Sequence, residues 1–164
     1  MTYRDPPVRI RSYDVPEGTR SIAVAWERFS TAEDACRRFP NEACVYAFQS
    51  KATSLYVGKA TGFRRRYSAG AMGALLLNSD IRLFVAPVDA SLLAFIEHTI
   101  VFWDCPPHNT RLKGTRPWPH IPLVHTFDGV SSWWGCGHAR EVGKAYQGPQ
   151  FCGPGTIREA NIGL

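Results

Sequence analysis

The chain has 164 residues, a mass of 18.3 kDa, 45% apolar residues and a formal net charge of +5. This length suits one domain, and the apolar fraction excludes a wholly disordered chain. The longest apolar run, residues 43–48, is far short of the ~20 residues that cross a bilayer, and the start lacks the apolar core of a secretory signal, so we expect neither a membrane nor a secreted protein.

The hydrophobic pattern predicts six elements in the first two thirds of the chain. In chain order they are a helix, two strands, a helix, a strand and a helix, at residues 31–38, 44–48, 53–57, 63–68, 81–86 and 91–104. Thr31 or Ser30 can cap the first helix, and Pro40 ends it. This order predicts a small α/β (α+β) domain with helices packed on a sheet.

Composition divides the chain into three predicted regions: an N-terminal extension at 1–40, a core at 41–113, and a C-terminal extension at 114–164 that is rich in Trp, Pro and Gly. Both extensions are expected to be loop-rich. Three of the five tryptophans fall in the last region. Because tryptophan buries a large apolar area, we expect this extension to pack on the core.

Two tyrosines flank the connection between the predicted strands. Tyr46 and Tyr56 are equidistant from Lys51, so a symmetric hairpin would place them directly opposite each other on one face of the sheet. Such a pair can pack, donate hydrogen bonds or transfer a proton. Two half-buried strand aromatics are the simpler interpretation of this pair taken alone.

The segment from Gly58 to Arg66 combines a glycine, a lysine and a helix start after a strand, which is typical of backbone that approaches a phosphate. It is not a Walker loop, because the spaced glycines and the GKS or GKT ending are absent. Helical geometry directs Arg66 differently from Arg65, so it can turn toward the sheet. Three solvated arginines on a surface helix are the alternative.

Glu97 lies in a helix that is apolar on nearly every side. A carboxylate in such surroundings is costly unless it is paired or binds a metal. A structural ion pair with Arg66 or Arg82, in a protein-interaction domain, is therefore an alternative to a functional role. Asn109, after a double proline, fits a turn equally well.

Taken together, these residues resemble the GIY-YIG nuclease signature. Val45-Tyr46 is followed by Tyr56-Val57-Gly58, then by Lys59, Arg66, a helical Glu97 and Asn109. The motif spacing is most similar to that of the N-terminal nuclease domain of the excision-repair protein UvrC, over roughly residues 43–113. The resemblance implies a small three-stranded antiparallel sheet flanked by helices, and hydrolysis of DNA phosphodiester bonds with one divalent metal, Mg²⁺ or Mn²⁺.

The resemblance also implies a role for each matched residue. Glu97 would hold the metal, Tyr46 would be the general base, and Tyr56 would assist in positioning or proton transfer. Lys59 and Arg66 would hold the scissile phosphate, and Asn109 would orient the site. A tyrosine base needs its pKa lowered from ~10, which Lys59 and the metal could do.

Basic residues are concentrated in two segments. Residues 43–79 contain five of them and no acid, and residues 110–127 contain three more. A local positive field favours a polyanionic partner, with a solvated basic surface as the alternative. The candidate nucleic-acid contacts are Lys59, Arg64, Arg65, Arg66, Arg111, Lys113 and Arg116.

We therefore expect a DNA endonuclease, with RNA left open as a substrate and a homodimer expected only if both strands are cut. The rival is a non-catalytic nucleic-acid-binding module of the same fold, in which Cys44 and Gly70 replace residues of the family pattern. Five irregularly spaced cysteines indicate reduced thiols and a cytoplasmic location. Cys136, His138 and Cys152 have no recognised zinc spacing, and metal binding by them stays open.

Overall fold

A computed structural model describes residues 9–50, 53–69 and 80–127 of the chain. In these segments the elements run in the following order: β1 (Arg9–Ser12), β2 (Ile22–Phe29), α1 (Ala32–Arg38), β3 (Cys44–Ser50), β4 (Thr53–Ala60), α2 (Phe63–Ala69), β5 (Ile81–Pro87), α4 (Leu93–Asp104), β6 (Thr115–Trp118) and β7 (Leu123–Phe127). No helix in the described segments is long and apolar enough to span a membrane.

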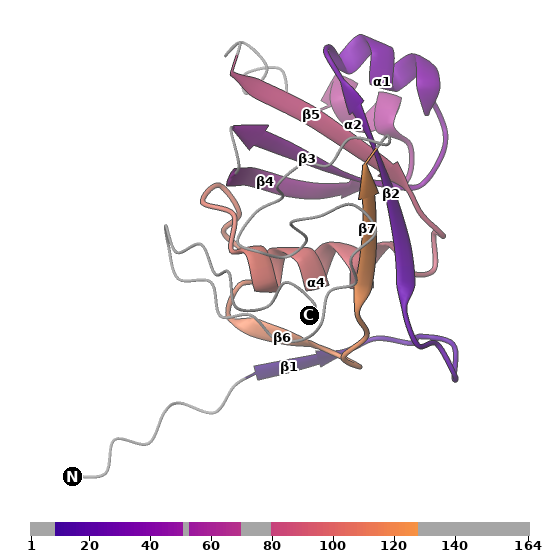
Figure 1. Ribbon diagram of the computed structural model, residues 1–164, viewed down its shortest axis with the longest axis vertical. Coiled ribbons are helices and arrows are strands. Elements are labelled where there is room, and N and C mark those ends of the chain that lie inside the picture. Colours follow the sequence, from indigo (N-terminus) through magenta and orange to yellow (C-terminus); the bar gives the residue numbers. More distant parts are fainter. Residues whose placement is uncertain (1–8, 51–52, 70–79, 128–164) are drawn as a thin grey trace, which may run out of the picture.

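The main sheet has five strands in the order β4-β3-β5-β2-β7, and β4 forms one edge of it. β4, β3, β5 and β2 pair antiparallel in turn, whereas β7 lies parallel to β2. Helices α1 and α2 lie toward one end of the molecule, and α4 runs beneath the sheet (Figure 1). A separate parallel ribbon of β1 and β6 lies along the far side of α4.

Two apolar clusters lie on opposite faces of this sheet, as the alternation of side chains along a strand requires. One joins α4, through Phe95, Ile96 and Ile100, to residues such as Val45 and Val57. The other joins α1 and α2 to the opposite face of β3. Both faces of β3 are therefore covered, and six of its seven residues are buried. The edge strand β4 lies where the two covered faces meet solvent.

The six predicted elements are confirmed, with ends that differ by a few residues. Thr31 caps α1 as expected, because its side chain accepts a hydrogen bond from the backbone N–H of Asp34. The prediction of a three-stranded sheet is wrong. β2, from the region 1–40, and β7, from the region 114–164, extend the sheet to five strands. Cys136, His138 and Cys152, for which metal binding was left open, lie outside the described residues, as does most of the C-terminal extension.

The predicted register of the hairpin is also wrong. Tyr46 is paired with Gly58, and Tyr56 is paired with Phe48. Ser50 pairs with Thr53, so the hairpin is centred between residues 51 and 52 and not on Lys51, and a bulge between Phe48 and Gln49 shifts the pairing by one further residue. The extra residue in β4, Leu55, accepts a hydrogen bond from the backbone N–H of His108 at 2.9 Å. Tyr46 and Tyr56 are diagonal neighbours on one face, with ring centroids 6.2 Å apart.

Candidate active site

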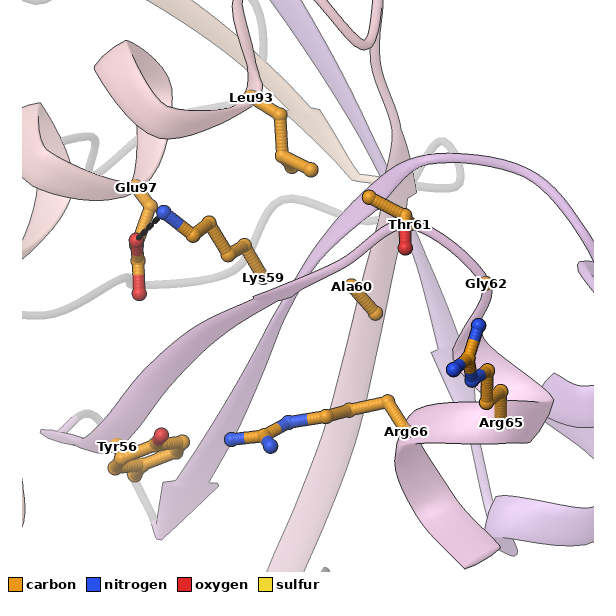
Figure 2. Close-up of a pocket in the computed structure, with 9 residues that line it drawn as sticks. All are labelled: Tyr56, Lys59, Ala60, Thr61, Gly62, Arg65, Arg66, Leu93 and Glu97. Carbon is orange, nitrogen blue, oxygen red and sulfur yellow. Dashed lines mark ion pairs between the residues drawn. The ribbon is translucent and has the colours of Figure 1, made fainter. Parts of the chain in front are cut away.

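A depression at the open edge of the sheet is lined by four of the six predicted catalytic residues, namely Tyr56, Lys59, Arg66 and Glu97. Its lining comes from β4, the loop after it, α2 and α4, and it encloses a volume of about 470 Å³. Figure 2 shows that Lys59 reaches toward Glu97 while Arg66 reaches toward Tyr56. We call this the Glu97 depression, defined by Tyr56, Lys59, Thr61, Gly62, Arg65, Arg66 and Glu97.

Of the residues that the structure describes, Glu97 is the one carboxylate that lines the Glu97 depression, and its side chain is 13% exposed. Its Oε2 lies 3.3 Å from the Nζ of Lys59, which is 45% exposed. The predicted partners Arg66 and Arg82 are therefore replaced by Lys59 in this ion pair. Burial raises the pKa of Glu97 above its usual range, and the charge of Lys59 offsets part of this effect.

Tyr46 lies under β4 and is fully buried. Its ring passes directly beneath Gly58, where a Cβ would lie 2.5 Å from its Cζ. Glycine is therefore required at this position by close approach, not by its backbone angles. The ring also packs edge-on against Phe63 of α2, with centroids 5.6 Å apart.

The hydroxyl of Tyr46 accepts a hydrogen bond from Nε of Arg66 at 3.3 Å. Arg66 thus turns toward the sheet, as its helical position predicted. Burial raises the pKa of Tyr46 to about 12, although Arg66 acts in the opposite direction. The expectation that Lys59 lowers this pKa is not met, because Lys59 lies on the other face of β4 and pairs with Glu97.

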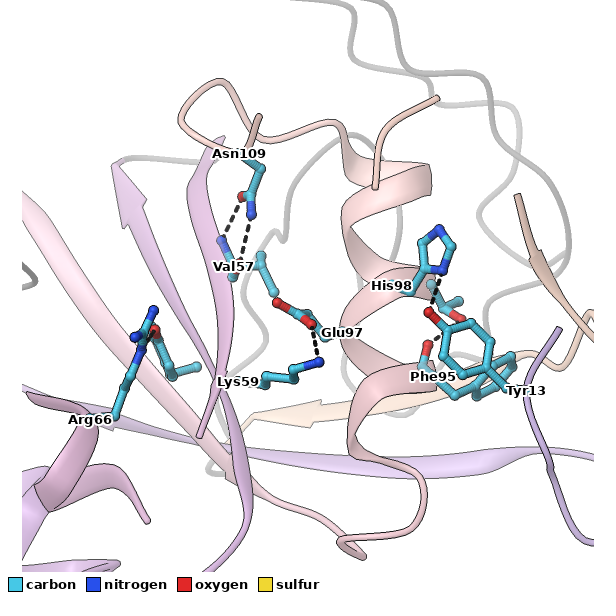
Figure 3. Close-up of polar contacts among 10 residues, drawn as sticks. Tyr13, Val57, Lys59, Arg66, Phe95, Glu97, His98 and Asn109 are labelled. Atoms are coloured by element: carbon cyan, nitrogen blue, oxygen red, sulfur yellow. Dashed lines mark hydrogen bonds and ion pairs between the residues drawn. The ribbon is translucent and has the colours of Figure 1, made fainter. Parts of the chain in front are cut away.

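Asn109 holds the backbone of β4 in place. Its Oδ1 accepts from the N–H of Val57 at 2.9 Å, and its Nδ2 donates to the carbonyl oxygen of Val57 at 2.8 Å. The side chain is buried and completes the hydrogen bonding of the edge strand one residue before Gly58 (Figure 3). Asn109 therefore positions Lys59 through the strand, and does not line the depression.

The other predicted nucleic-acid contacts divide into two groups. Arg65 lines the Glu97 depression and Arg64 lines a neighbouring one. Arg111, Lys113 and Arg116 do not line the Glu97 depression. Arg116 instead lies over the ring of Trp103, 5.7 Å from its centroid.

Cys44, which replaces a residue of the GIY-YIG pattern, and Tyr67, the neighbour of Arg66, do not line the Glu97 depression. Cys44 fits inside β3 without exposure, and burial raises the pKa of its thiol to about 12. Tyr67, which follows Arg66 on α2, donates from its hydroxyl to Glu33 on α1 and so faces away from Glu97. Gly70 lies outside the described residues.

A buried hydrogen-bond network on the far side of α4 was not predicted from the sequence. His98 is fully buried, its Nδ1 lies 2.7 Å from the hydroxyl of Tyr13, and its Nε2 lies 2.5 Å from the carbonyl oxygen of Thr115. A carbonyl accepts only, so Nε2 carries the proton and Nδ1 accepts from Tyr13. Burial lowers the pKa of His98. Consecutive residues Glu97 and His98 therefore face opposite sides of the helix (Figure 3).

Comparisons with known proteins do not assign a family. Searches of protein-family models, curated proteins and solved structures each found no significant match. Within the described segments, no group of three or more His, Cys, Asp or Glu side chains is placed to hold a metal ion. The residues of the Glu97 depression are therefore the basis for any chemistry assigned to it.

Proposed function

We propose that the protein is a divalent-metal-dependent endonuclease of GIY-YIG type that hydrolyses DNA phosphodiester bonds. One observation carries the proposal: Glu97 shares a water-accessible depression with Lys59, Arg65, Arg66 and Tyr56. A carboxylate beside several cations and a phenol is suited to a phosphodiester, whose negative charge grows as water attacks it.

The donor set suits a hard cation that keeps most of its waters. Mg²⁺ binds through one or two carboxylates and retains water ligands, so Glu97 alone would hold it. Its buried carboxylate has a raised pKa, and a cation beside it would stabilise the ionised form. When bound, the ion would supply Lewis acidity and a water of lowered pKa.

Lys59 has two potential anionic partners in this proposal. Without substrate it pairs with Glu97 through a half-exposed Nζ. A phosphate in the depression would compete for that ammonium group, which leaves Glu97 available to a metal. Arg66 can present its terminal nitrogens to the same phosphate while its Nε holds the hydroxyl of Tyr46.

Removal of a proton from the attacking water is the step that demands most of the protein. Tyr46 is the proposed general base; its ring is fully buried and does not line the Glu97 depression, and its hydroxyl accepts a hydrogen bond from Arg66, which does line it. Because burial raises its pKa to about 12, the phenolate would depend on that arginine and on a nearby cation for stabilisation. Tyr56 lines the depression directly and would contact the attacking water or the phosphate.

The decisive experiment compares Glu97→Gln with the wild-type protein on supercoiled, linear and single-stranded DNA, with Mg²⁺ or EDTA. Glutamine keeps the side-chain shape and removes the metal-binding charge. We expect Mg²⁺-dependent cutting by the wild type and its loss in the variant, with unchanged melting temperature and DNA binding. Cutting retained by Glu97→Gln would remove the metal assignment.

A non-catalytic nucleic-acid-binding module is the second candidate. The Lys59–Glu97 pair favours it, because the pair compensates the buried carboxylate without a metal. This candidate predicts salt-sensitive DNA binding by the wild type with no product under any metal condition. The same set of incubations therefore separates the two.

A further inference from the structure

A second depression adjoins the Glu97 depression on the side of α2. The two share Thr61, Gly62 and Arg65, and the second is completed by Pro40, Asn41 and Arg64. We call it the Asn41 depression. Among the described residues, its lining includes two guanidinium groups, a hydroxyl and an amide, and no carboxylate. It therefore offers hydrogen-bond donors and positive charge to an anion.

The three consecutive arginines of α2 divide between the two depressions. Arg66 turns under β4 to the hydroxyl of Tyr46. Arg65 turns back toward Gly62 (Figure 2) and lines both depressions. Arg64 lines the Asn41 depression but not the Glu97 depression. Such a division follows from the roughly 100° rotation between successive helical residues. The three arginines therefore occupy successive positions along the two depressions and do not form a single cluster.

A third depression continues the series but is less positive. It shares Pro40 and Arg64 with the Asn41 depression and reaches Arg37 of α1. Glu33 also lines it, and Arg37 is paired with Asp34 at 2.7 Å. These carboxylates offset the positive charge there, so the binding argument ends at the Asn41 depression.

We propose that the Asn41 depression binds the phosphodiester next to the scissile one, so that a substrate strand leaves the candidate active site across the start of α2. This inference rests on the proposed function for the identity of the scissile phosphate. Arginine forks bind phosphate oxygens in two-bond geometry, and Asn41 and Thr61 add donors. Among the residues that the structure describes, no aromatic side chain lines the Asn41 depression, so this part of the chain offers no platform for base stacking there.

The first test measures binding and needs no cleavage. Wild type, Arg64→Ala, Arg65→Ala and the double variant are titrated in EDTA against a fluorescein-labelled DNA duplex at several salt concentrations. Each lost phosphate contact reduces the slope of log K against log salt by about 0.9. We expect a reduction of about one for each single variant and about two for the double.

Arg38→Ala is the matched control. Arg38 is on α1, is 60% exposed and pairs with Glu27, and it lines none of the three depressions. We expect its salt slope and affinity to equal those of the wild type. An unchanged slope in the double variant, or an equal reduction in Arg38→Ala, would overturn the proposal.

A second test locates the contact on the substrate. Single neutral methylphosphonate linkages are placed on either side of the cleaved bond. A neutral linkage on one flank should slow cutting by the wild type, and the Arg64→Ala/Arg65→Ala double variant should be insensitive to it. Equal sensitivity of the two proteins on both flanks would refute the subsite. If the wild type binds but never cuts, the proposed activity fails, and the salt slopes alone decide the subsite.

Discussion

Gly58→Ala is expected to be the most destabilising small substitution in the candidate site. An added Cβ would lie 2.4 Å from the hydroxyl oxygen of Tyr46 and 2.5 Å from its Cζ, inside contact distance of a fully buried ring. The ring or the strand must therefore move. Overpacking of this kind costs about 1–3 kcal/mol. Loss of the Arg66–Tyr46 hydrogen bond adds roughly 1 kcal/mol.

The sum, about 2–4 kcal/mol, corresponds to a fall in melting temperature of roughly 4–16 °C for a chain of this size. Thermal and urea unfolding measure it directly. Gly62→Ala is the control, because its Cβ would meet the carbonyl oxygen of Pro40 at an ordinary 3.6 Å. If Gly58→Ala unfolds at the same temperature as Gly62→Ala, the close packing of Tyr46 under β4 is not as described.

Three further predictions concern stability and rate. Asn109→Ala leaves the buried N–H and carbonyl groups of β4 without partners and should cost roughly 2–4 kcal/mol in urea unfolding; a cost under about 0.5 kcal/mol would show that water replaces the amide. Burial lowers the pKa of His98 in the folded protein below the ~6.5 of the unfolded chain, so the unfolded chain binds more protons and stability should fall as pH drops through ~6.5. His98→Phe should reduce this slope relative to the wild type, a comparison in which the opposite shift of Glu97 cancels. Under the proposed function, Tyr46→Phe should slow cutting by roughly 10²–10⁴-fold, while loss of the hydrogen bond from Arg66 should cost only about 1 kcal/mol of stability; normal turnover would remove Tyr46 as the base.

The sequence predicted local elements well because their signals are local. The cap at Thr31, the stop at Pro40 and the aromatic strands all act within a few residues. β2 carried a readable signal, since Ile22, Val24 and Trp26 alternate with exposed residues. β2 was not predicted, because residues that favour turns precede it in the sequence.

The pairing of strands that lie far apart in the sequence could not be predicted. β7 joins β2 across about a hundred residues, and nothing in either segment specifies that partner. The ion pair of Glu97 depends on which face of β4 carries Lys59, and the hairpin register depends on one bulged residue. The structure brings Tyr56, Lys59, Arg66 and Glu97 to one depression, and these are four of the six catalytic residues that the resemblance implies. A motif specifies an order of elements and not a single contact, so the spacing alone did not predict this depression.

The side chain of Asn109 also limits how copies of this protein can associate. An exposed edge strand invites another strand to pair with it, which is a common route to dimers and to aggregation. Here the outward N–H and carbonyl of Val57 are bound by an amide that imitates a neighbouring strand, and the carbonyl of Leu55 is bound by the backbone of His108. Addition of a strand along β4 would have to break all three bonds. Any dimer that cuts both strands of DNA should therefore form through another surface and leave this edge to the substrate.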